Sequence, residues 1–186
     1  ENAEAVVNND GRIVVYMGDD ERGEFVYRYV SNGVYAPGAP TDALLNDGIL
    51  YVAKFSDNGT GAWVALTPET TGMDQAEIHI HTRQAGSKVG ATTMDRPEWI
   101  SANPKAPEIY CCLTNNKNRG VKPNAGGDDT SVNGPNPREK NNYGQIVRWR
   151  PDGGDHTAPG FTWDLYVLAG NPTVHSDAYA GSANIN

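Results

Sequence analysis

Residues 1–20, ENAEAVVNNDGRIVVYMGDD, and residues 98–116, EWISANPKAPEIYCCLTNN, follow the same plan. In both, a glutamate stands before an apolar stretch, a turn and a run of β-branched, aromatic or other apolar residues, and a pair of acidic or amide residues comes next. The spacing from the glutamate to the pair is nearly equal, so the repeat places Glu1 and Glu98 in equivalent positions. Repeated small antiparallel sheets are typical of a β-propeller, in which each sheet forms one blade.

Further runs of this kind extend the pattern along the chain. They are bounded by Asn, Asp and Gly, which accept the positive φ of hairpin turns, as in NDG at 46–48 and DNG at 57–59. The predicted strands cover residues 12–16, 25–30, 49–55, 62–66, 109–113, 145–149 and 162–168. We therefore predict an all-β chain with one inserted helix, corresponding to about two blades of a larger propeller.

The repeat also divides the chain. Residues 1–70 form a first blade region with an extra hairpin at 49–66, and residues 71–94 form a helical insertion. Residues 95–170 form a second blade region with a long polar loop at 117–142, and residues 171–186 form a tail or a linker to the next blade. Because a propeller needs all its blades to close, uncovered blade edges would allow self-association.

The segment 74–88 departs from the strand pattern. Asp74 is a suitable N-cap, Glu77 completes a capping box, and Gly90 stands where a helix would stop, so we predict a helix. The alternative is a strand, because Glu77–His81 alternates with period two and would place His79 and His81 on one face as a metal-binding pair.

Composition narrows the range of partners. The chain has 186 residues, with Lys+Arg 15 against Asp+Glu 23 and a net charge of -8, which argues against nucleic acid or an anionic membrane as a partner. No apolar run reaches the ~20 residues that span a bilayer, and the N-terminus has no signal-peptide pattern, so no membrane insertion is expected. The excess of carboxylates over basic side chains favours cations as binding partners instead. The adjacent Cys111 and Cys112 are expected on opposite faces of one strand, without a disulfide.

Charged residues beside turns are the candidates for chemistry. Pro97 disfavours helical backbone at Arg96, so an extended segment should place Arg96 and Glu98 on the same side. A guanidinium for an oxyanion and a carboxylate for a cation suit phosphate bound against a metal, although an ordinary surface ion pair has the same spacing. The Asp19-Asp20 pair is likewise common in hairpin turns. In the polar loop, Asp128 and Asp129 could bind calcium, but a mobile, solvated loop is the expected state.

Several motifs, in the same order, resemble those of the PhoX alkaline phosphatases, and together they cover nearly the whole chain. They are VYMGDDER at 15–22, LYVAKF at 50–55 with DNGTG at 57–61, GATTMDRPE at 90–98, LTNN at 113–116, NYGQIVRW at 142–149 and FTWD at 161–164. The resemblance implies a propeller that holds iron and calcium ions, hydrolyses phosphate monoesters and is exported to the periplasm or secreted.

The resemblance also implies roles for single residues. Glu1 matches a glutamate that ligates iron, Asp20 matches a calcium-binding aspartate, and Asp19 beside it is a weaker metal candidate. Arg96 matches the arginine that binds the substrate phosphate, which makes it the catalytic and substrate-binding candidate, and Glu98 matches a carboxylate of the metal cluster.

The chain also departs from the family pattern. The family's cysteine iron ligand has no counterpart in these 186 residues, because Cys111 and Cys112 occupy a different position. The 186 residues are therefore expected to be a fragment that is inactive alone. Two alternatives stay open: a calcium-dependent lactonase or phosphodiesterase on a propeller scaffold, and a non-catalytic propeller module that binds partners.

Overall fold

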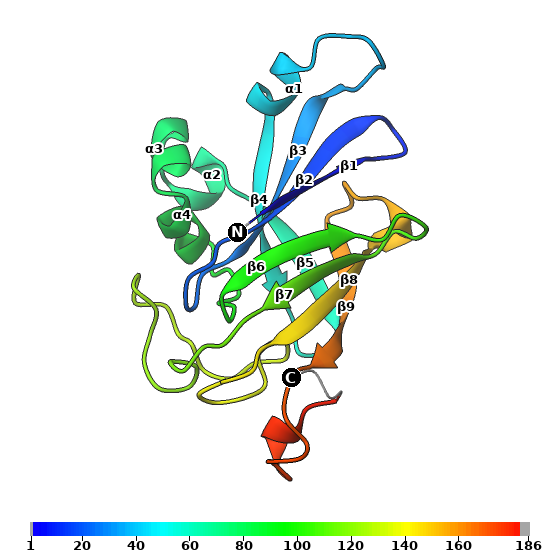
Figure 1. The fold of residues 1–186 in the computed structure, drawn as a ribbon. Coiled ribbons are helices and arrows are strands. Elements are labelled where there is room, and N and C mark those ends of the chain that lie inside the picture. The colour runs from blue at the N-terminus through cyan, green and yellow to red at the C-terminus, as the bar shows by residue number, and fades with distance from the viewer. Residues whose placement is uncertain (1, 183–186) are drawn as a thin grey trace.

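The structure, a computed structural model that describes residues 2–182, is mainly antiparallel β-sheet (Figure 1). Its nine strands form one sheet in the order β1-β2-β3-β4-β5-β9-β8-β7-β6. The strands are β1 (Ala3–Val7), β2 (Arg12–Gly18), β3 (Val26–Val34), β4 (Gly48–Phe55), β5 (Thr60–Ala65), β6 (Pro97–Ala102), β7 (Ile109–Leu113), β8 (Gln145–Pro151) and β9 (Gly160–Leu168). The sheet is thus two meanders, β1–β5 and β6–β9, joined where Thr60 pairs with Thr162.

The predicted strands are confirmed: the strand at 109–113 has the predicted bounds, and each of the others is part of a longer strand or has a shifted end. Gly11 and Gly59 adopt positive φ in the turns that precede β2 and β5, as hairpin chemistry requires. The sequence indicated only an apolar stretch where β1 lies and a short extended segment where β6 begins. Both are edge strands, each of which pairs with one neighbour only.

The sheet curves until its two edge strands meet. Asn2, directly before β1, donates from Nδ2 to the Ile100 carbonyl (2.8 Å) and accepts from the Ile100 N–H at Oδ1 (2.7 Å). The Ala102 N–H donates to Glu4 Oε1 at 3.0 Å. The side chains of Asn2 and Glu4 therefore satisfy backbone groups of β6, which leaves the sheet nearly closed.

Aromatic side chains fill the inner face of the curved sheet. Trp149, fully buried, lies 5.5 Å from Tyr16 and 6.1 Å from Trp63 between ring centroids. Phe161 packs 5.3 Å from Trp63. The guanidinium of Arg28 is also buried here and donates to the carbonyls of His156 and Ala158, both at 2.8 Å. This interior is one core shared by both meanders.

Helices cover the outer face of β3–β5 (Figure 1). The predicted helix exists, with Asp74 and Glu77 forming the capping box, but it is broken at His81 into α3 (Gln75–Ile80) and α4 (Thr82–Lys88). The alternative strand with His79 and His81 on one face is therefore wrong.

The prediction of one inserted helix was incomplete. The described residues also contain α1 (Asp42–Asn46), α2 (Pro68–Thr71), η1 (Asp152–Gly154) and η2 (Ala178–Ala180). These helices are each a turn or so long and depend on local contacts, such as the Thr67 capping box of α2 and burial of Leu44 in α1. Short helices of this kind carry almost no periodic signal.

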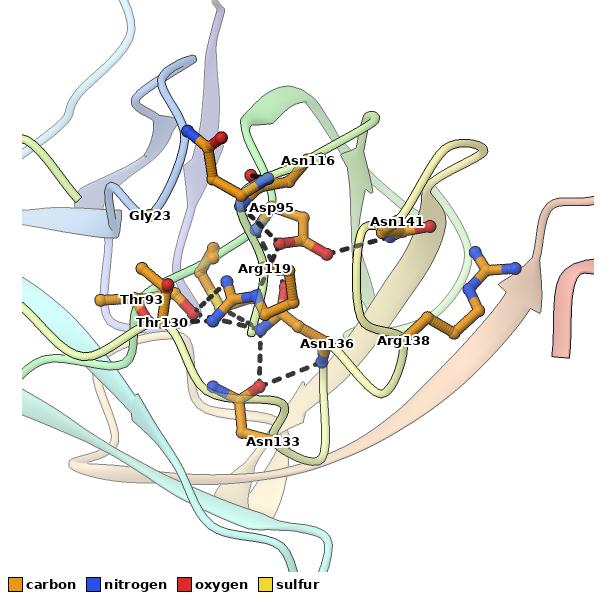
Figure 2. A network of polar contacts seen from close by, with 12 residues as sticks. Gly23, Thr93, Asp95, Asn116, Arg119, Thr130, Asn133, Asn136, Arg138 and Asn141 are labelled. Atoms are coloured by element: carbon orange, nitrogen blue, oxygen red, sulfur yellow. Dashed lines mark hydrogen bonds and ion pairs between the residues drawn. The ribbon is translucent and has the colours of Figure 1, made fainter. Parts of the chain in front are cut away.

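The polar loop 117–142 is packed, contrary to the expectation of a mobile, solvated segment. Arg119, Asn136 and Asn141 are fully buried, and they bond to Asp95 and its neighbours (Figure 2). Hydrogen bonds here replace the apolar burial that the loop's composition cannot supply.

The cysteines behave as predicted. Both are free thiols; Cys111 points into the core and Cys112, half-buried, to the other face. Burial raises the pKa of both thiols, and the nearby Glu98 raises that of Cys112 further.

Strands β1–β5 lie within residues 1–70, and strands β6–β9 lie within residues 95–170. The division of the chain into blade regions stays a prediction, as does self-association. No helix within residues 2–182 is long and apolar enough to cross a membrane.

Trp149 at the centre of the aromatic cluster should dominate stability. Trp149→Ala is expected to lower the free energy of unfolding by about 3–5 kcal/mol, because it removes a large side chain from a closed interior. The matched control, Trp99→Ala, removes an indole that is 66% exposed and should cost little. Urea unfolding of both variants measures the difference; equal losses would contradict this account of the core.

Candidate functional site

Arg96 lies at the entrance to β6, between Asp95 and Pro97. Its φ is +53°, in the left-handed region, so the expected extended backbone at Arg96 is wrong. The reason is tertiary: the Arg96 carbonyl accepts from the Thr114 N–H (3.3 Å), and its own N–H donates to the Met94 carbonyl (3.1 Å). These contacts outweigh the local preference of a residue before proline.

The side chain of Arg96 lies between two carboxylates. Its Nε is 3.0 Å from Asp20 Oδ1, its Nη2 donates to Asp20 Oδ2 at 3.2 Å, and Nη2 is 3.5 Å from Glu98 Oε1. The three side chains are each about a quarter exposed. The structure therefore brings together Arg96 and Glu98, at the start of β6, and Asp20, which follows the end of β2.

Gly18 permits this meeting. A Cβ at Gly18 would lie 2.7 Å from the Pro97 carbonyl oxygen and 3.0 Å from that of Glu98, both backbone atoms that cannot move aside. The end of β2 thus touches the start of β6 directly, and Asp20, two residues beyond Gly18, reaches Arg96. A side chain at position 18 of this chain would therefore displace backbone.

Asp19 and Asp20 diverge. Both oxygens of Asp19 accept from Arg83 on α4, at 2.7 Å each, in a bidentate ion pair. Asp19 thereby fixes the helical segment to the end of β2, away from Arg96. Glu1 lies outside the described residues, so its position relative to this group is not part of the structure.

Sequence reasoning missed Glu24, a buried carboxylate behind Asp19. Glu24 is 2% exposed, its Oε2 has no hydrogen bond, and Arg83 Nε lies 3.7 Å from that oxygen. Burial raises its pKa to about 7, and the neighbouring carboxylates of Asp19 and Asp128 act in the same direction. Its position directly before the buried run that starts at Phe25 was the only signal in the sequence.

The other sequence candidates are engaged in local contacts. Asp128 accepts from Ser87 Oγ at 2.6 Å, and Asp129 accepts from Ser131 Oγ at 2.7 Å. Gln75 bonds with His79 along one helix, at 2.8 Å. Across residues 2–182 no group of three or more His, Cys, Asp or Glu side chains is arranged to hold a metal ion.

The charges around Arg96 define what the group can do. Two carboxylates surround one guanidinium, so the cluster carries an excess negative charge and would repel a free oxyanion. Asp20 Oδ1 is buried and accepts no hydrogen bond of good geometry, although Arg96 Nε is close. Cations bound by the carboxylates would remove the repulsion and free Arg96 to bind an oxyanion.

Comparisons with known proteins agree on one family. The family model described as alkaline phosphatase PhoX matches residues 1–186. A solved structure, Pseudomonas fluorescens PhoX in complex with vanadate, a transition state analogue, is 48% identical with a TM-score of 0.90. The match covers 100% of this chain and 34% of the solved one, so the chain spans about a third of that protein. No curated protein matches the chain.

Glu24 should make stability depend on pH. Its pKa is raised from 4.5 to about 7, so between these values the folded state keeps a proton that the unfolded chain releases. Stability therefore falls as pH rises from about 4.5 to 7, by up to about 3 kcal/mol from this group alone.

Glu24→Gln removes the titrating group while keeping its shape. Urea unfolding between pH 4 and 8 should show that the variant lacks this decline and is more stable than the parent above pH 7. Parallel pH profiles for the two proteins would contradict the assignment.

Proposed function

The chain belongs to the PhoX alkaline phosphatase family, and we propose that it supplies part of the active site of a metal-dependent enzyme that hydrolyses phosphate monoesters. The observation that carries the proposal is the meeting of Arg96 with Asp20 and Glu98. It adds to the family match a cluster whose charges suit phosphate held against cations. The activity of the whole protein is part of the proposal, because the chain spans only a third of the solved relative.

In this proposal Arg96 binds the substrate phosphate. A planar guanidinium presents two N–H groups to two phosphate oxygens, and the left-handed backbone holds its side chain at the mouth of the cluster. Phosphoryl transfer spreads negative charge over the equatorial oxygens, and Arg96 is placed to neutralise it. The relative bound to vanadate, a transition state analogue, supports a site of this chemical class.

Asp20 and Glu98 are the proposed metal ligands, with Asp19 and Glu1 as further candidates. Their oxygen donors fit calcium, which takes six to eight oxygens, and carboxylates also ligate iron. Asp20 Oδ1 supports this assignment, because it is buried and accepts no hydrogen bond, with only the ion pair to Arg96 Nε at 3.0 Å. Asp19 is the weaker candidate, since Arg83 occupies both of its oxygens. Further ligands would come from outside residues 2–182.

The described residues act by binding and positioning. When bound, iron and calcium supply Lewis-acid polarisation of the phosphoryl group. The negatively charged carboxylates of Asp20 and Glu98 would bind the metal cations. Arg96, no longer paired with Asp20, would then orient the phosphate.

The remaining expectations follow the family. We propose that the two meanders correspond to two blades of a propeller, with uncovered edges open to self-association, and that the protein is periplasmic or secreted in a bacterium. The single continuous sheet means that these blade units share hydrogen bonds through β5 and β9.

Arg96→Ala tests the proposed role. In the full-length protein supplied with iron and calcium, the variant should lose about 10²–10³-fold in kcat/KM on a phosphate monoester, because it removes a donor to the developing charge. Arg148→Ala is the matched control, since Arg148 also pairs with a carboxylate on β9, at 2.6 Å, outside the cluster. Activity retained by Arg96→Ala, or preference for a phosphodiester or lactone, would contradict the proposal.

The 186-residue chain alone should bind metal weakly and turn over no phosphate monoester, because only part of a ligand set lies in its described residues. Purified chain assayed with iron and calcium, beside the full-length protein, measures this. Comparable turnover by the two would show that these residues form a complete site.

A further inference from the structure

We propose that the buried Asp95–Arg119 ion pair is a positioning device for Arg96. The pair links the polar loop 117–142 to the backbone directly before Arg96 and holds that residue in its left-handed conformation. The inference rests on the proposed role of Arg96 in binding phosphate.

Asp95 is fully buried and bonded on both oxygens (Figure 2). Oδ1 accepts from Arg119 Nε at 2.7 Å and from Asn116 Nδ2 at 2.8 Å, and Oδ2 accepts from Asn141 Nδ2 at 2.9 Å. The Asp95 N–H donates to Asn136 Oδ1 at 2.9 Å. Side chain and backbone of this one residue are therefore both fixed by the loop.

Arg119 is also fully buried, and its two terminal guanidinium nitrogens donate to Thr93 and to the polar loop. Nη2 donates to the Thr93 carbonyl at 2.9 Å, and Nη1 donates to Thr93 Oγ1 at 3.1 Å and to the Ser131 carbonyl at 3.2 Å. Its charge cancels that of Asp95 in the interior, where an unpaired charge would be costly. Residues 93 and 95 are thus clamped by one side chain.

The bonds that fix Thr93 and Asp95 also restrict the backbone of Arg96, the next residue. A non-glycine residue at φ +53° is disfavoured and persists only where its surroundings over-determine it. Asp95 is fixed on one side of Arg96, and on the other side Pro97 has a fixed φ and pairs with Leu113. Because both neighbours are held in place, the backbone at Arg96 is fixed, and its side chain is directed toward Asp20 and Glu98.

A purely structural role is the alternative, in which the network only anchors the polar loop. The positioning role and the purely structural role differ in whether the effect on phosphate binding requires the Arg96 side chain. A positioning pair affects phosphate binding only while the Arg96 side chain is present, whereas loss of fold affects it in any background.

A double-mutant cycle separates them. The pair-removing variant, Asp95→Asn with Arg119→Gln, keeps the interior uncharged. We expect it to raise the inhibition constant for inorganic phosphate about tenfold or more in the metal-loaded full-length enzyme, because small misplacement of a binding group is costly. In an Arg96→Ala background the same two changes should have no further effect on that constant.

Arg28→Lys is the matched control, because Arg28 is a buried arginine of the aromatic core whose guanidinium donates to the backbone carbonyls of His156 and Ala158. It should lower the melting temperature and leave phosphate inhibition unchanged. If the pair-removing variant does not fold, Arg119→Lys replaces it in the cycle, and a smaller rise that again requires Arg96 is expected.

The outcomes are distinct. Unchanged phosphate inhibition in the network variants, or an equal rise with and without Arg96, would overturn the positioning role alone. Unchanged inhibition in Arg96→Ala itself would overturn the proposed function, and the positioning role with it.

Discussion

The direct contact between the end of β2 and the start of β6 is the constraint on which the rest of the structure depends. Gly18 lies so close to the Pro97 carbonyl that no larger residue fits without displacement of backbone. Asn2 extends the same contact by satisfying both backbone groups of Ile100. The two edges of the sheet therefore face each other, and residues from its opposite ends share one cluster.

Closure of the sheet also explains the division between its inner and outer faces. Inside, aromatic rings and the buried Arg28 form a core that both meanders need. Outside, α3 and α4 cover β3–β5, and the Asp19–Arg83 ion pair ties them to the end of β2. The same two-residue acidic turn thus serves two purposes: Asp19 fixes a helix, and Asp20 faces Arg96.

The polar loop shows that burial without apolar residues can still build rigid structure. Its arginine and asparagine side chains surround Asp95 and leave its carboxylate fully bonded (Figure 2). Satisfied polar networks of this kind specify one geometry, because each partner has a fixed donor or acceptor direction. Because Arg96 is the next residue, the bonds at Asp95 also fix the backbone directly before it.

The sequence by itself determined the strands other than β1 and β6, the hairpin turns, the helix cap at Asp74 and the residues to examine, because these follow from local alternation, turn chemistry and family motifs. Local patterns could not predict that Arg96 adopts positive φ, that Asp19 turns away from Asp20, or that Glu24 and Asp95 are buried. Each of these depends on residues from distant parts of the chain, such as Arg83, Thr114 and Arg119. The tertiary structure decided them, because a buried charge or a strained backbone is stable only where partners from elsewhere in the chain meet it.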